Sequence, residues 1–67
     1  MPKKIRELKA ALRKAGFKVR SGKGSHSVWE HPRRAKTVTL AGKDGRDAQP
    51  YQEQQVAQAL RDVGASS

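Results

Sequence analysis

The sequence predicts a small α+β domain, a two-layer α-β-β-β-α sandwich in which a three-stranded antiparallel sheet carries both helices on one face. Three observations support this prediction. Apolar residues recur at helical spacing near both ends of the chain, three short segments of strand character lie between them, and glycine or proline separates the elements. The 67 residues are expected to form one domain, 1–67, because a chain of this length builds a single small core.

The first helix is expected over residues 3–15. Ile5, Leu8 and Leu12 recur at spacings of three and four, which places them on one face of a helix. Lysine and arginine cover most of the remaining surface. Gly16 follows the last apolar position, where a helix commonly ends.

The middle of the chain predicts three short strands, at residues 17–20, 25–30 and 37–40. The first alternates apolar and basic side chains, and the third is rich in β-branched residues. The glycine-containing segment 21–24 is typical of a hairpin loop. The segment 31–34 should interrupt the sheet, because its proline cannot donate to a strand ladder.

A polar loop over 41–49 leads to a second helix, which begins at Pro50 and ends at Gly64. Its apolar stripe should complete one core with the first helix and the sheet. The residues expected in this core are Ile5, Leu8, Leu12, Phe17, Val19, Val28, Val38, Leu40, Val56, Leu60 and Val63.

The orientation of the second strand has two solutions. Neighbouring strand residues face opposite sides of a sheet, so either Val28 or Trp29 enters the core. We expect Val28 to point inward, which leaves Trp29 on the open face and free to stack on a base. If Trp29 is the core residue, these assignments reverse.

The charge of the chain indicates an anionic partner. Fifteen lysines and arginines oppose six acidic residues, and twelve of the fifteen lie in residues 1–36. A dense cationic surface attracts nucleic acid, the partner that we expect, ahead of an acidic protein or an anionic membrane. The absence of cysteine excludes disulfides and thiolate chemistry. No run approaches the roughly 20 apolar residues of a membrane span, so we expect a soluble, cytoplasmic protein.

His26 is the candidate catalytic residue. Histidine is the side chain that most readily exchanges a proton near neutral pH, as the cleavage of RNA through its 2′-hydroxyl requires. Basic side chains at Arg20 and Lys23 could hold the phosphate, and backbone N–H groups near Gly24 could add anion contacts. A lone histidine is more often structural, so spacing alone leaves both roles open.

The second histidine could be a turn residue that bonds to the backbone, and the sequence leaves open whether it supplies a second proton transfer. His31 precedes Pro32, and its separation of five from His26 puts the two on opposite sides of a regular strand. The acidic residues are scattered as well. We therefore expect no metal site and no small-molecule cofactor.

Several short motifs follow one another in the order of a known family. They are Ile5, Leu8 and Leu12 with Ala15-Gly16-Phe17, then Lys23-Gly24-Ser25-His26, His31-Pro32, Thr37-Val38-Thr39-Leu40, and the helix from Pro50 to Gly64. In these motifs the chain resembles the HicA, or YcfA-like, family of bacterial toxins. The Gly-Ser-His triplet alone is not specific, whereas the ordered run is fairly specific.

The resemblance implies a fold like that of double-stranded-RNA-binding domains and an activity as a metal-independent mRNA interferase. It also implies a HicB-type antitoxin that masks the catalytic histidine, which corresponds to His26. Segment 41–49 departs from the family, being longer and more charged than the usual loop. Pro50-Tyr51-Gln52 also replaces the common Pro-Gly-Thr. The residues expected to contact RNA are Lys18, Arg20, Lys23, Gly24, Ser25 and Trp29.

Two functions therefore remain open. The first is an endoribonuclease that uses His26 as general base or acid. The second is a non-catalytic RNA-binding module of the same fold, which would recognise RNA by shape. Cleavage products would distinguish the first from the second.

Overall fold

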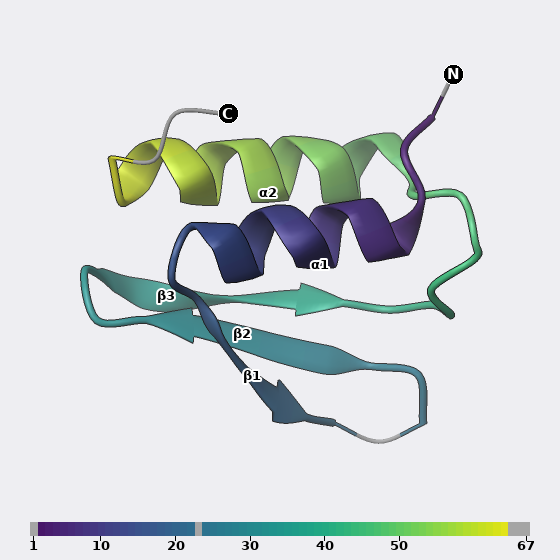
Figure 1. The fold of residues 1–67 in the computed structure, drawn as a ribbon, viewed down its shortest axis with the longest axis horizontal. Coiled ribbons are helices and arrows are strands. Elements are labelled where there is room, and N and C mark those ends of the chain that lie inside the picture. The colour runs from purple at the N-terminus through teal and green to yellow at the C-terminus, as the bar shows by residue number, and fades with distance from the viewer. Residues whose placement is uncertain (1, 23, 65–67) are drawn as a thin grey trace.

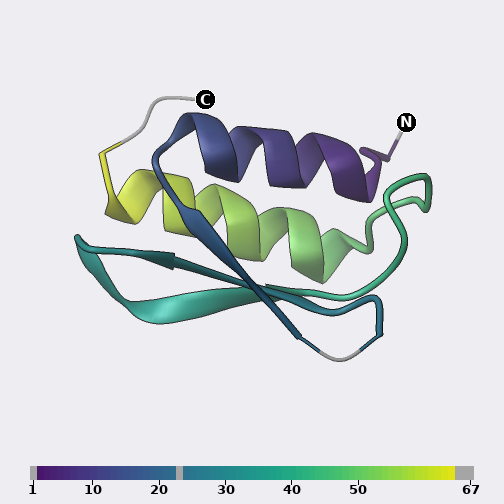
Figure 2. The same cartoon turned by 60° about the horizontal axis from the view of Figure 1, so that its bottom comes forward.

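The strands form one antiparallel sheet in the order β1-β2-β3, and both helices lie on the same side of it (Figures 1 and 2). A computed structural model of the protein describes residues 2–22 and 24–64. The elements are α1 (Ile5–Lys14), β1 (Lys18–Ser21), β2 (Ser27–His31), β3 (Arg34–Leu40) and α2 (Pro50–Asp62). The predicted α+β class, with its α-β-β-β-α order, is confirmed.

The element boundaries lie close to the predicted ones, and the largest difference is at the start of β3. This strand begins at Arg34 and not at Thr37, because His31 of β2 pairs with Arg34 across the turn. Only Pro32 and Arg33 remain outside the ladder. Proline is tolerated there because a turn residue has no strand partner to which it must donate.

The segment between β3 and α2 folds back over the start of α1. The Ile5 N–H donates to the carbonyl of Arg46 at 2.9 Å, and the Arg6 N–H donates to the carbonyl of Asp44 at 3.1 Å. The first N–H groups of a helix have no partner inside it, so this crossing satisfies two of them. The segment also places Ala48 in the core. The segment is therefore part of the packed structure, whereas its composition predicted only a polar loop.

The core lies between the sheet and the two helices. Most of its predicted members are buried: Ile5, Leu8, Leu12, Phe17, Val38, Leu40, Val56, Leu60 and Val63. Ala59, expected beside the buried stripe of α2, is buried as well, and the structure adds Trp29 and Ala48. Two predicted members, Val19 and Val28, are not buried.

The predicted orientation of β2 is wrong. Trp29 points into the core with 0% of its surface exposed, and the half-exposed Val28 faces the other side. An indole buries far more apolar surface than a valine, and its N–H must find a partner inside. That partner is Ser27, whose Oγ accepts from Trp29 Nε1 at 3.0 Å.

The exposure of Val19 follows from its place at the sheet edge. Val19 and Val38 flank Trp29 on neighbouring strands, so all three side chains face the helices. Val38 is fully buried, whereas Val19 keeps 49% of its surface exposed. Strand β1 forms the edge of the sheet and diverges from the helical layer (Figure 1). Val19 therefore points toward the helices, as predicted, but it lies too close to the edge of the sheet to be covered by them.

Candidate functional site

His26 lies where the β1–β2 hairpin returns to the sheet, directly before β2. The Gly22 N–H donates to the His26 carbonyl at 3.1 Å and closes the hairpin. A Cβ on Gly22 would come within 3.1 Å of the same oxygen, so glycine permits this close approach. The His26 side chain is exposed and makes no hydrogen bond to any residue that the structure describes.

An open hollow lies beside His26. Its walls come from the hairpin, from α1 and from the segment that follows β3. The residues that give the hollow its polar character include Gly24, Ser25, His26, Lys9, Arg13 and Lys43. Two parts of the chain, α1 and the segment after β3, thus bring basic side chains around one exposed imidazole. We call this surface the His26 hollow.

The charges of the His26 hollow are only partly neutralised. Lys9 Nζ lies 2.6 Å from Asp44 Oδ1. The hydrogen bond from Lys9, followed by the charge of Lys9, holds the pKa of Asp44 below its ordinary value. Within residues 2–22 and 24–64, Arg13 and Lys43 form no ion pair. The surface therefore retains positive charge that can bind an anion.

Arg13 is braced by the core. Its guanidinium carbon lies 5.4 Å from the centroid of the Trp29 ring, in a cation–π arrangement. Arg13 itself is exposed, whereas Trp29 is fixed by burial and by its hydrogen bond to Ser27. The indole thus supports a cation at the wall of the hollow.

The structure divides the residues that were predicted to contact RNA. Gly24 and Ser25 line the His26 hollow, as expected from their place in the hairpin. Trp29 is buried, so the prediction that it lies open for stacking on a base is wrong. Lys23 lies outside the residues that the structure describes.

Lys18 and Arg20 lie on the opposite face of the sheet from Trp29. Their strand partners are Glu30 and Val28, which alternate with the buried side chain. Arg20 also pairs with Glu30, with 2.9 Å between Nη2 and Oε2. Neither residue is brought into the hollow that holds His26, and their contact with RNA stays a prediction.

The basic residues that line the hollow were not predicted as site residues from the sequence. Lys9 and Arg13 are four residues apart, and this spacing places them on one face of α1. The spacing could have indicated a shared basic face, but lysine and arginine cover most of this helix, so these two residues did not stand out. Lys43 is brought in by the crossing of its segment over α1, which no local pattern indicates.

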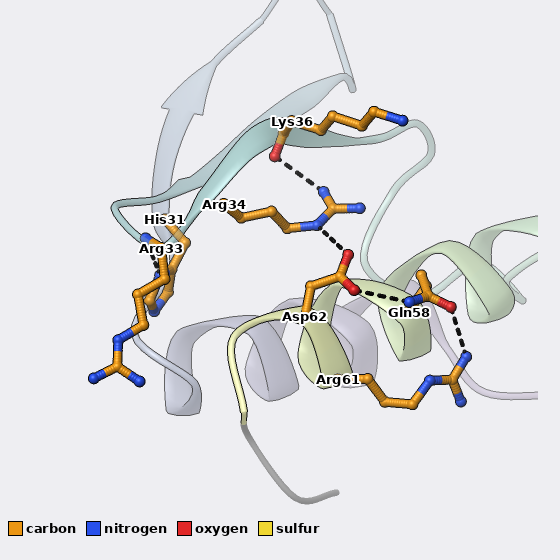
Figure 3. Close-up of polar contacts among 7 residues, drawn as sticks. All are labelled: His31, Arg33, Arg34, Lys36, Gln58, Arg61 and Asp62. Carbon is orange, nitrogen blue, oxygen red and sulfur yellow. Dashed lines mark hydrogen bonds and ion pairs between the residues drawn. The ribbon is translucent and has the colours of Figure 1, made fainter.

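His31 makes the backbone hydrogen bonds of a turn residue. Its Nδ1 accepts the Arg33 N–H at 3.0 Å and therefore carries no proton (Figure 3). The neutral ring then donates from Nε2 to the carbonyl of Ala15, 3.2 Å away. The ring also contacts Phe17, with 4.9 Å between centroids. Both nitrogens are thus occupied, in contrast to those of His26.

The two histidines lie at opposite ends of β2. Five residues of strand at about 3.3 Å each separate them by roughly 16 Å, too far to share a metal or a substrate proton. In the part of the chain that the structure describes, there is no group of three or more histidine or acidic side chains that could hold a metal ion. Nor does any described helix have the length and apolar character to cross a membrane.

Comparison with known proteins identifies the family. A family model of HicA toxins of bacterial toxin–antitoxin systems matches residues 5–65. No curated protein and no solved structure matches the chain. The matched range spans all five helices and strands and includes the Gly-Ser-His segment. The chain therefore belongs to the HicA toxin family of bacterial toxin–antitoxin systems, and this membership implies an antitoxin as its partner.

Proposed function

We propose that this toxin is a metal-independent endoribonuclease that cleaves mRNA with His26 as its proton-transfer residue. One observation carries the proposal: His26 is exposed in a basic hollow with no hydrogen bond to a described residue, whereas both nitrogens of His31 are occupied. An imidazole that exchanges a proton with a substrate must have an accessible nitrogen. His26 meets this requirement.

The proposed reaction is a transesterification within the RNA. Neutral His26 removes the proton of a 2′-hydroxyl, and the 2′-oxygen attacks the adjacent phosphorus. The bond from phosphorus to the 5′-oxygen of the next nucleotide breaks, and that oxygen takes a proton from water or from the protonated imidazole. The products are a 2′,3′-cyclic phosphate and a free 5′-hydroxyl. Negative charge that grows on the phosphate is stabilised by nearby donors and cations.

The hairpin would contribute anion contacts beside His26. Gly24 has a positive φ of 62° with open space where a Cβ would stand, so the backbone of this turn is accessible to an RNA strand. Ser25 adds a hydroxyl on the same lining. On the other face of the sheet, Lys18 and Arg20 would add to the long-range attraction of RNA.

We also propose that the antitoxin is of the HicB type and restrains the toxin by covering His26. Because the His26 imidazole is exposed in an open hollow, nothing in the described part of the toxin blocks the access of RNA to it. A protein that covers the hairpin would exclude the substrate directly. An acidic contact surface would complement the basic residues of the hollow.

The experiment that tests the activity compares the wild type with His26→Ala and His26→Gln. Each protein is purified identically and incubated with long single-stranded RNA in excess EDTA. The ends of any fragments are then analysed. We expect fragments with cyclic phosphate ends from the wild type alone. The His26 side chain is exposed and makes no hydrogen bond to any residue that the structure describes. Both variants should therefore keep the wild-type melting temperature, which would exclude misfolding as the cause of lost cleavage.

Other results would contradict the proposal. Equal cleavage by all three proteins would point to a contaminating nuclease or to a different catalytic residue. Loss of cleavage on addition of EDTA would contradict the metal-independent mechanism. RNA binding with no cleavage by any of the proteins would favour the non-catalytic RNA-binding module.

A further inference from the structure

We propose that Arg13 and Lys43 together bind the RNA phosphate that lies next to His26. This inference rests on the proposed function, because it names the residues that would hold the RNA backbone at the same site. The principal phosphate contacts would then come from α1 and from the segment after β3, and not from β1. Arg13 and Lys43 both line the His26 hollow.

Arg13 is prepared for this contact. Its guanidinium carbon lies 5.4 Å from the centroid of the Trp29 ring, and the residue remains exposed. A guanidinium presents several N–H donors in a planar fork that matches two phosphate oxygens. The cation–π contact with a fixed ring favours one position of the side chain, so less conformational freedom is lost when the phosphate binds.

Lys43 is held near the hollow by the backbone of its own segment. The Arg46 N–H donates to the Lys43 carbonyl at 3.0 Å, and the Arg46 carbonyl accepts from Ile5 at the start of α1. The segment is therefore attached to α1 through the carbonyls of Asp44 and Arg46. It carries Lys43 as an exposed cation at the edge of the hollow.

Asp44 explains why Lys9 is not the main anion contact. Its carboxylate lies 2.6 Å from Lys9 Nζ and neutralises that ammonium. Neither Arg13 nor Lys43 has such a partner among the described residues. An arriving phosphate would therefore meet two cations from different parts of the chain, with His26 on the same surface.

The test measures RNA binding separately from cleavage. All variants are made in the His26→Ala background, and the anisotropy of a labelled single-stranded RNA is followed from low to high salt. Arg13→Gln and Lys43→Gln should each weaken binding about 10-fold, as expected for loss of a charged hydrogen bond. Each should also reduce the slope of log K against log salt by about 0.7, the value for one phosphate contact on a single strand.

Matched variants control for the loss of charge alone. Arg33→Gln removes the same side chain from the turn at the opposite end of β2. Lys14→Gln removes a charge from α1 on the side that faces the groove between the helices. Both should weaken binding by less than threefold. Arg13→Lys, which keeps the charge, should retain the wild-type salt slope but bind less tightly than arginine.

Equal effects of the four glutamine variants would overturn the inference, because they would show a diffuse attraction with no defined phosphate site. Absence of RNA binding by the His26→Ala protein would overturn it as well. The cleavage assay is read independently. Loss of binding in Arg13→Gln and Lys43→Gln would support the phosphate site even if wild type cut no RNA. Normal binding by both variants would refute the site even if His26 proved essential for cleavage.

Discussion

The Nε2 atom of His31 lies 3.2 Å from the carbonyl oxygen of Ala15 and joins the end of α1 to the end of β2. The last carbonyls of a helix have no partner inside it, so this contact satisfies one of them. The other nitrogen of the ring accepts the Arg33 N–H and fixes the turn into β3. One side chain therefore connects α1, β2 and the turn into β3.

Replacement of His31 should reduce stability without removing the proposed chemistry. We expect His31→Ala to lower the free energy of unfolding by about 2 kcal/mol, from two hydrogen bonds and the contact with Phe17. Urea unfolding would measure this change. His26→Ala should have the reverse profile, with stability kept and RNA cleavage lost. If His31→Ala abolished cleavage while still fully folded, our assignment of the two histidines would be wrong.

Gly16 should be intolerant of alanine for two reasons. Its φ of +96° lies in the region that disfavours other residues, and an added Cβ would come 3.3 Å from His31 Nε2. We expect Gly16→Ala to cost about 1–3 kcal/mol in unfolding free energy. Gly64→Ala is the matched control, because Gly64 also has a positive φ but no atom within 4 Å of the added Cβ. Thermal melts that showed a larger loss in Gly64→Ala would contradict the contact with His31.

The orientation of the sheet can be tested with two valines on neighbouring strands. Val38 is fully buried beside Trp29, whereas Val28 is half-buried on the opposite face. Val38→Ala should cost roughly 2 kcal/mol, because two buried methyl groups are removed and a cavity remains. Val28→Ala should cost less than about half of that. Chemical denaturation of both variants would measure the difference, and a reversed order would restore the orientation with Val28 inside.

Asp62 should make part of the stability of the domain dependent on pH. It accepts hydrogen bonds from Arg34 Nε at 2.9 Å and from Gln58 at 2.8 Å (Figure 3). The contact with Arg34, followed by that with Gln58, lowers the pKa of Asp62 from its ordinary value of 3.8. A lowered carboxyl pKa stabilises the folded state above the unfolded pKa, and this gain is lost as pH falls through the folded value.

Asp62→Asn should therefore melt below the wild type at pH 7, by a small margin because the group is exposed. The margin should shrink as pH falls below about 4, where the carboxyl of the unfolded chain becomes protonated. Melting curves from pH 7 to pH 2 would follow it. A margin that stayed constant over this range would mean that the charge of Asp62 contributes nothing.

The helices, the strand order and most of the core could be predicted from the sequence because their signals are local. The spacing of Ile5, Leu8 and Leu12 defines the buried face of α1 whatever packs against it. Proline at the start of α2 and glycine after each helix similarly set the helix ends through their own backbone conformation. The Gly-Ser-His segment also identified His26 as the candidate site residue.

The tertiary structure alone decided which face of β2 is buried. Strand parity permits either Val28 or Trp29 in the core, and the face that the helices cover decides between them. It also decided which cations surround His26. Arg13 and Lys43 are 30 residues apart, and they line the same hollow because the segment after β3 crosses the start of α1. Such an arrangement depends on how distant segments of the chain pack against each other. Periodicity and local motifs report only on residues that are close in sequence.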